Sequence, residues 1–359
     1  MRHRFVRTAL AGLSAVALAA GLAASPAEAA AGPLITGLAG PLSISVDHGK
    51  IYVAQSFGGM LTRYGVDGSG GKVLVKRSPK VEVAAVQAKG PGLLYAVTGK
   101  NADGKFAKLK HRAEDGTVTT RADLRGFERR FNPDGHVTYN FRDISKACSA
   151  KVPEQVGGAS YTGIVDSHPY ATAMMADGTA VVADAAGNDL ITVSPSGFRT
   201  EIATLPAQPV KITKGLAHKF GMPGCVVGHK FWFEPVPTDV EVHDGLLYVT
   251  VLPGGPEDPS LGARGSVYTV NPRNGRSHRV AGGFLGATDV AVGPHGKLFV
   301  AELFGGKISV ISHGRVSTYV ELPGALSVDY ARGTLYAGTI APTDDNGAPT
   351  GPGTLVAIR

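Results

Sequence analysis

The sequence lacks most of the patterns that usually announce an enzyme. It contains no nucleophile elbow, P-loop, dinucleotide-binding fingerprint or zinc-protease motif. It has only two cysteines, which allow at most one disulfide, and a single tryptophan. The missing motifs weaken the case for catalysis.

Long apolar runs are also scarce. The one clear run, residues 9–24, follows three arginines and ends before the sequence Pro26-Ala27-Glu28-Ala29. This pattern is typical of a Sec-type signal peptide, so we predict that residues 1–29 are removed and that the protein is secreted. A membrane helix is the alternative for this run. No later window is apolar enough to cross a bilayer, so we expect no membrane span in the mature chain.

Charge of one sign is not concentrated. The formal net charge is +7 at pH 7, and the cations are scattered apart from residues 105–112 and 125–130. No aromatic side chains alternate with a basic stripe. We therefore predict that the protein does not bind nucleic acid.

The chain does contain a six-fold repeat. Each copy reads as an apolar run, a glycine-containing turn and a second apolar run, such as LYVTV from Leu247. The copies are residues 40–55, 81–98, 169–184, 237–251, 287–302 and 325–339. A period of about 40 residues in strands is typical of a β-propeller. We predict an all-β fold: a single six-bladed β-propeller over residues 30–359, with insertions at 123–167 and 206–235.

The two ends of the mature chain predict how the ring closes. The fifth repeat divides into the strands ATDVAV, KLFVAE, KISVI and RVSTYV. Residues 354–358 match a third strand with no fourth after it, and residues 33–38 match a fourth strand with no third before it. Pairing these two segments would close the ring through the N-terminal strand and leave no open edge.

The long connections fall on one side of the predicted ring. In a meandering propeller, the second-to-third and fourth-to-first connections share a face. The long segments 123–167, 205–236, 252–264 and 340–353 are all of these kinds, whereas the turns at 47–49 and 294–296 are short. This predicts a surface for a small molecule or protein partner on the long-loop face. The alternative is that these long loops are tolerated insertions without a function.

The two cysteines lie in the two largest insertions. In an exported chain, Cys148 and Cys225 are expected to form a disulfide that ties these insertions together. Two free buried thiols are the alternative.

Polar residues recur on the predicted first strands, which line the channel. Alignment of the repeats places one set at the same level of the channel: Ser43, Thr172, Asp239, Asp289 and Ser327. A second set lies one pleat further along these strands: Ser45, Glu241 and Asp329. Converging carboxylates repel one another unless a cation or water separates them. A channel Ca²⁺ or Mg²⁺ is one interpretation. A wet channel whose acids bond to backbone amides is the other.

Further oxygen ligands come at the ends of the second strands, which open toward the long-loop face. These positions are Gln55, Thr98, Asp184, Glu302 and Thr339. Asp184 also forms an oxygen-rich group with Asn188 and Asp189, which suits either a hard cation or turn capping. The predicted metal ligands are Asp184, Asp239, Asp289 and Glu302.

His168 is the predicted catalytic residue. It lies where the first insertion enters the third repeat, so it could act there as a general base or metal ligand. A structural histidine is the alternative. His218 and His229 in the second insertion are similarly placed, and residues 231–233 (FWF) could form an apolar wall or pack over the ring.

Three stretches resemble the ScyD/ScyE family of exported bacterial proteins. They are HPYATAMMADGTAVVADAAGNDLITVS from His168, VPTDVEVHDGLLYVTVLPG from Val236 and GATDVAVGPHGKLFVAEL from Gly286. The resemblance implies a six-bladed propeller of the gluconolactonase-like, NHL-like and streptogramin-lyase-like class. Gluconolactonase-like relatives hold a divalent metal in the channel, a role that the four predicted ligands would fill here. Streptogramin lyases pair histidine with glutamate near magnesium, which would involve Glu302 with His168 or His218.

Two functions follow as hypotheses. The first is an exported propeller that binds a ligand or partner on the long-loop face without a dedicated catalytic motif. The second is a divalent-metal-dependent lactonase or lyase at the channel mouth, with Asp289 and Glu302 as ligands and His168 as base.

Overall fold

The structure is a computed structural model that describes residues 32–359, except residues 79, 91, 257 and 343–348. Within these residues the strands form seven four-stranded sheets, six of which follow the sequence repeat. The prediction of an all-β fold is confirmed. The predicted signal peptide, residues 1–29, lies outside the described residues.

Five of the repeat sheets are meanders of consecutive antiparallel strands. Sheet 1 is β2 (Pro41–Asp47), β3 (Lys50–Gln55), β4 (Met60–Gly65) and β5 (Lys72–Val75), and sheet 2 is β6 (Val81–Lys89), β7 (Gly92–Asn101), β8 (Gly104–Arg112) and β9 (Val118–Asp123). Sheet 3 is β12 (Pro169–Met174), β13 (Ala180–Asp184), β14 (Asp189–Val193) and β15 (Arg199–Thr204). Sheet 4 is β18 (Pro237–His243), β19 (Leu246–Val251), β20 (Gly265–Val270) and β21 (Ser277–Phe284), and sheet 5 is β22 (Ala287–Val292), β23 (Leu298–Glu302), β24 (Lys307–Ser312) and β25 (Arg315–Glu321).

The sixth sheet combines the two ends of the described chain. It runs β26 (Ala325–Ala331), β27 (Thr334–Thr339), β28 (Gly353–Ile358), with β1 (Ile35–Leu38) as its outer strand. Ile35 lies opposite Leu355, and the Leu34 amide donates a hydrogen bond to the Leu355 carbonyl at 2.7 Å. The pairing expected between residues 33–38 and 354–358 is therefore present.

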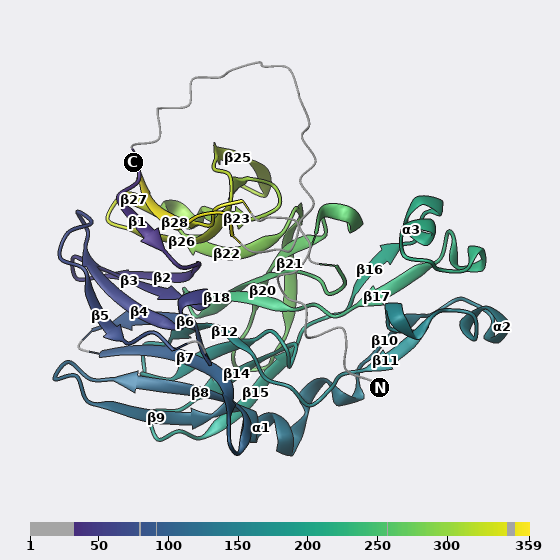
Figure 1. The fold of residues 1–359 in the computed structure, drawn as a ribbon, viewed down its shortest axis with the longest axis horizontal. Coiled ribbons are helices and arrows are strands. Elements are labelled where there is room, and N and C mark those ends of the chain that lie inside the picture. The colour runs from purple at the N-terminus through teal and green to yellow at the C-terminus, as the bar shows by residue number, and fades with distance from the viewer. Residues whose placement is uncertain (1–31, 79, 91, 257, 343–348) are drawn as a thin grey trace.

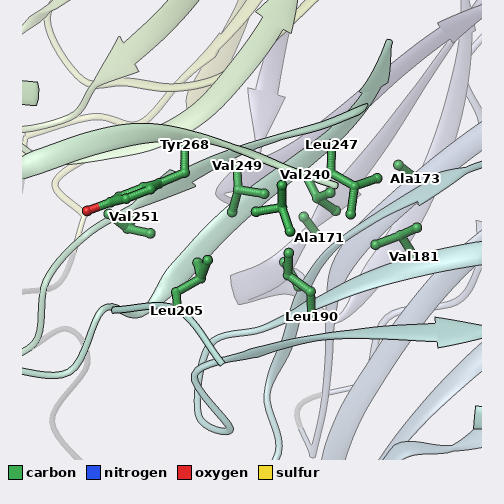
Figure 2. Close-up of a cluster of buried hydrophobic side chains, with 12 residues drawn as sticks. Ala171, Ala173, Val181, Leu190, Leu205, Val240, Leu247, Val249, Val251 and Tyr268 are labelled. Atoms are coloured by element: carbon green, nitrogen blue, oxygen red, sulfur yellow. The ribbon is translucent and has the colours of Figure 1, made fainter. Parts of the chain in front are cut away.

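The first strands of the six sheets pack beside one another in chain order. β2 contacts β6, and the series continues through β12, β18 and β22 to β26, which contacts β2 again. Apolar layers fill the space between neighbouring sheets. Figure 2 shows one of them, in which Val181 and Leu190 of sheet 3 pack with Val240 and Val249 of sheet 4. These β-branched and aliphatic side chains suit the half-buried surface of a strand.

The two insertions form a seventh sheet that the repeat did not predict. Its order is β11 (Ser160–Thr162), β10 (Thr138–Phe141), β17 (Lys230–Phe233) and β16 (Gln208–Lys211), so each insertion supplies two strands. We call residues 138–162 and 208–233 the insertion lobe. In Figure 1 this lobe projects to the right, away from the repeat sheets.

Short helices complete the insertions and the turns. The α-helices of the described residues are α1 (Leu124–Phe131), α2 (Lys146–Ser149) and α3 (Lys214–Lys219). The 3-10 helices are η1 (Ser56–Gly58), η2 (Pro133–His136), η3 (Glu154–Val156), η4 (Gly224–Val226), η5 (Pro259–Leu261) and η6 (Pro294–Gly296). Asp123 begins α1 by accepting a hydrogen bond from the Gly126 amide, and Asn132 ends it in the left-handed conformation.

The disulfide prediction is confirmed. Cys148 and Cys225 are bonded and join the two halves of the insertion lobe. Around the bond, Phe141, Ile212 and Phe231 belong to one buried cluster. The lobe thus has a small core of its own, reinforced by a covalent link.

Candidate functional site

A histidine and a glutamate meet where the first strands of sheets 2 and 3 begin. His168 immediately precedes β12, and Glu82 is the second residue of β6. Nε2 of His168 lies 2.9 Å from Oε2 of Glu82, and each side chain is 31% exposed. The predicted residue His168 therefore has an acidic partner that can be reached from solvent.

Two hydroxyl groups orient the carboxylate of Glu82. Ser56 Oγ donates a hydrogen bond to Oε1 at 2.6 Å, and Thr98 Oγ1 donates to Oε2 at 3.5 Å. Sequence reasoning placed Thr98 on this face but missed Glu82. The two residues are directly opposite in the β6–β7 hairpin, so the cross-strand register was the signal that could have revealed the glutamate.

The backbone of His168 is fixed from the other side. Asp184 accepts hydrogen bonds from the His168 amide at 2.6 Å and from the Ser167 hydroxyl. Asp166 forms ion pairs with Arg125 of α1, at 2.6 Å, and with Lys105 of β8. The segment that carries the histidine is thus anchored to sheets 2 and 3 before it enters β12.

The histidine and glutamate shift each other's pKa in opposite directions. Burial alone would raise the pKa of Glu82, but the charge of His168 and hydrogen bonds from His168, Ser56 and Thr98 lower it to about 2. Burial would lower the pKa of His168, yet the Glu82 carboxylate outweighs it and raises that pKa. Between the two pKa values the pair is an imidazolium and a carboxylate.

An apolar cluster lies beside this pair. Its buried members Leu42, Ala84, Leu326 and Ile340 pack with the partly buried Tyr170 and Leu303, so it gathers side chains from sheets 1, 2, 3, 5 and 6. The Tyr170 ring meets the His168 ring edge-on, with 5.6 Å between centroids. The arrangement can therefore offer a ligand a charged pair at the margin of an apolar surface.

The carboxylates predicted to line a channel form hydrogen bonds with the next sheet. Oδ2 of Asp239 accepts from the Val290 amide of β22 at 3.0 Å. Oδ2 of Asp329 accepts from the Val46 amide of β2 at 2.6 Å. These contacts agree with the interpretation in which the acids bond to backbone amides, and they link neighbouring first strands.

Asp239 and Asp289 are brought together, as the alignment predicted, and share a hydrogen bond. Burial raises the pKa of Asp239 to about 6. Burial and the neighbouring Asp239 charge raise the pKa of Asp289 well above its usual range, so the two carboxyl groups titrate as a pair. The register places Ala171, rather than Thr172, at this level of sheet 3.

Residues at the ends of the second strands share one structural role in three sheets. Gln55, Asp184 and Glu302 each accept a hydrogen bond from an amide just before their own first strand, at 2.8, 2.6 and 2.6 Å. Glu302 also accepts from Ser309 Oγ and is 3% exposed. No hydrogen bond or ion pair within the described residues joins Glu302 to Asp184, Asp239 or Asp289. The metal assignment of these four residues stays a prediction.

A second acidic cluster lies behind Asp184. Glu128 of α1, Asp134 of η2 and Asp189 of β14 are each at most 1% exposed. Burial and nearby carboxylates raise the pKa of Glu128 to about 8 and that of Asp189 well above its usual range. Burial also raises the pKa of Asp134, to about 6, against hydrogen bonds from Asn188 and Tyr139.

Of this second cluster, sequence reasoning singled out Asp189 and its neighbour Asn188 but missed the two acids of the first insertion. The four-residue spacing of Leu124 and Glu128 places both on one helix face, so helical periodicity could have indicated that Glu128 is buried.

The other predicted residues of the second insertion belong to the lobe. His218 is exposed on α3, and His229 Nδ1 pairs with Asp143 Oδ2 at 3.1 Å. The Arg142 guanidinium lies over the Trp232 ring, 3.7 Å from its centroid. Phe231 packs against Phe141 and Phe233. The aromatic triplet therefore packs within the lobe.

A hollow of about 550 Å³ lies between the lobe and the connection after β19. It is lined on the lobe side by Val210, Lys211 and Leu216, and on the other side by Leu261 and Arg264. Two of the long connections thus meet around one concave surface.

Within the described residues, no three His, Cys, Asp or Glu side chains are already arranged to hold a metal ion. No helix of the described part is long and apolar enough to cross a bilayer.

Sequence comparison and structural comparison give different results. No protein-family pattern matches the chain, and no curated protein matches its sequence. Among solved structures, a streptogramin B lyase shares 15% identity and a TM-score of 0.48 over 90% of this chain and 84% of that one. A Bacteroides thetaiotaomicron protein of unknown function shares 10% identity and a TM-score of 0.50 over 88% and 69%. These similarities concern the fold alone, and the chain's own four-stranded sheets agree with a propeller-like architecture.

Proposed function

We propose that this chain is a secreted ligand-binding propeller of the ScyD/ScyE kind, with its site at the His168–Glu82 pair on the long-loop face. The observation that carries the proposal is the pair itself, 2.9 Å apart and 31% exposed on each side. Both partners are held from behind, by Asp184 and by Ser56. A pre-organised charged pair beside an apolar cluster is what a small-molecule site requires.

The six repeat sheets are the blades of one ring in this proposal. The cyclic contacts of their first strands support it, as does the pairing of β1 with β28. Export rests on residues 1–29, whose sequence matches a signal peptide. The disulfide is consistent with an oxidising compartment.

The surroundings of the pair indicate the chemistry of the ligand. His168 supplies a cation, Glu82 an acceptor, and Tyr170 an aromatic edge beside aliphatic side chains. A matching ligand carries a hydroxyl or carboxyl group on an apolar body. Such a molecule can hydrogen-bond to the pair while its body covers the cluster.

A thermal-shift and calorimetry screen tests this proposal with aromatic and sugar-derived hydroxy acids and their lactones. A hit should lose at least tenfold in affinity with His168→Ala and Glu82→Gln. His278→Ala is the matched control, because His278 is exposed on β21 of sheet 4. A hit that binds His168→Ala as tightly as the wild type would assign the site to another surface.

The alternative is a divalent-metal-dependent lactonase or lyase at the same mouth. One observation favours it: an imidazole and a carboxylate in contact can act as an acid–base pair. The enzyme would then hydrolyse or cleave the screened lactones, and mass spectrometry would detect the product. Turnover should be lost in His168→Ala and in Glu82→Gln. Binding without turnover, in protein purified with divalent metal present, favours the non-catalytic function.

A further inference from the structure

Two buried carboxyl groups behind the proposed binding face have no hydrogen-bond partner within the described residues. Glu128 is 1% exposed and Asp189 is 0% exposed. Neither oxygen of either group has a hydrogen-bond partner within the described residues. Protein interiors rarely leave carboxylate oxygens in this state, because a buried charge needs a partner of opposite sign or a donor.

The two groups converge on Gly187. A Cβ atom built on this glycine would lie 3.1 Å from Oδ1 of Asp189, 3.3 Å from Oε2 of Glu128 and 3.5 Å from Cγ of Asp184. Atoms of all three acidic side chains therefore lie within 3.5 Å of one point. A side chain at position 187 would crowd that point.

The other nearby acids are largely satisfied. Asp184 accepts hydrogen bonds from the amides of His168 and Gly187 and from Ser167 Oγ. Oδ2 of Asp134 accepts from Tyr139 and Asn188, which leaves only its Oδ1 without a partner. Within the described residues, the two carboxyl groups left without any donor are those of Glu128 and Asp189.

Two cations of this region are already engaged with Asp166. Arg125 lies on α1 three residues before Glu128, but its guanidinium is paired with Asp166, as is the Lys105 ammonium. Once ionised, two carboxyl groups that have no hydrogen-bond partner within the described residues are the complement of one divalent cation.

We propose that Glu128 and Asp189 bind one calcium ion between α1 and the 184–189 turn. All the donors are oxygens, as calcium prefers, whereas zinc favours nitrogen and sulfur. Calcium–oxygen distances are about 2.3–2.6 Å, so oxygens on opposite sides of the ion lie roughly 5 Å apart. Carboxylates with that spacing form no hydrogen bonds with each other, which agrees with their unpartnered state.

Binding requires a small inward movement of these side chains, because no finished cage is present within the described residues. Glu128 comes from α1, at the start of the insertion that carries half of the lobe, and Asp189 comes from sheet 3. Calcium therefore clamps the base of the insertion to the repeat sheets. This inference does not depend on the proposed function of His168.

The test uses the mature, disulfide-bonded protein, stripped with EGTA and then titrated with Ca²⁺ alone. We expect calcium at one hundred times its Kd to raise the melting temperature by about 5 °C. One equivalent should remain bound after gel filtration, measured by elemental analysis. Asp189→Asn and Glu128→Gln should each weaken binding at least tenfold. Asp244→Asn, an identical change at an exposed turn, should leave it unchanged.

A second readout does not depend on stability. Terbium in the calcium site should luminesce on tyrosine excitation, because the Tyr139 hydroxyl lies 3.1 Å from Oδ2 of Asp134, which Asn188 of the 184–189 turn contacts at 2.9 Å. Calcium should quench that signal by displacement. The proposal is overturned by a wild type that retains less than about a tenth of an equivalent at saturating calcium. It is equally overturned if Asp189→Asn binds calcium as tightly as the wild type. A melting temperature of either variant above that of the calcium-saturated wild type would also overturn it, because that result would show that protons, and not calcium, neutralise the cluster.

Discussion

His168 is held by two carboxylates that act on different parts of it. Glu82 contacts the ring through Nε2, whereas Asp184 accepts from the backbone amide. The first contact sets the charge of the imidazole, and the second sets where the residue stands. A substitution at Glu82 should therefore change the electrostatics of the site more than its shape.

Glu82→Gln tests the ion pair through its pH dependence. The pKa of Glu82 is lowered from 4.5 to about 2, so its stabilising contribution is present above pH 4.5 and is lost as the pH falls toward 2. The pKa of His168 is raised from 6.5, so its contribution is present below pH 6.5 and is lost as the pH rises through the raised value.

We expect the Glu82→Gln variant to lose about 1–2 kcal/mol of unfolding free energy between roughly pH 4.5 and 6.5, a value reduced for partial solvent screening. The loss should shrink on either side of that window. Urea denaturation of the wild type and the variant over a pH series measures it. A difference that stays constant with pH would contradict the ion pair.

Residue types at repeat positions were predictable, but side-chain partners outside the repeat were not. Asp184, Asp239 and Asp289 could be selected because the repeat aligns their strands, and His168 because it lies where the first insertion enters the third repeat. Glu128 belongs to a helix in an insertion with no counterpart in other repeats, so the alignment held no information about its burial. Its neighbours in space come from residues 184–189, which only the folded packing brings near.

At the scale of elements, the local sequence pattern predicted the strands of the repeat sheets but not those of the insertion lobe. The strands of sheet 5 were predicted to within one residue, because their alternation and turns repeat. β10 and β17 are four residues each and pair across almost a hundred residues of chain. Such short strands carry little periodicity, and long-range pairing leaves no local signal.

Replacing both cysteines by alanine tests how independent the lobe is. The disulfide closes a loop with a sequence separation of 77 residues, and removing such a bond costs about 2–4 kcal/mol. We expect faster proteolysis and hydrogen exchange within residues 138–162 and 208–233, with sheets 1, 5 and 6 unchanged. Equal protection of the lobe from proteolysis and hydrogen exchange in the wild type and the variant would show that the apolar core alone holds the lobe together.

At the scale of the molecule, β1 is the strand that the described residues before β2 contribute to the repeat sheets. It buries Ile35 at 6% and Leu38 at 1% exposure, and it covers the edge of β28. A mature chain that begins at Gly40 should lose about 3–6 kcal/mol relative to one that begins at Ala31, because two aliphatic side chains and an edge become exposed.

A matched pair of substitutions isolates the same contact without truncation. Leu38→Asp should lower the melting temperature as the truncation does, whereas Thr36→Asp, at an exposed position of the same strand, should not. Equal melting temperatures for the two chain lengths would remove the support for ring closure.

The position of the Cys148–Cys225 bond has a mechanical consequence. β12 to β15 all lie between the two cysteines in the chain, so the whole of sheet 3 is enclosed in a covalent loop. Tension applied to the two termini cannot extend that loop while the bond is intact. In a single-molecule pulling experiment, the oxidised protein should reach a contour length roughly 25 nm shorter than the reduced protein. Sheet 3, which His168 precedes and in which Asp189 begins β14, therefore lies in a segment that force cannot extend until the disulfide is reduced.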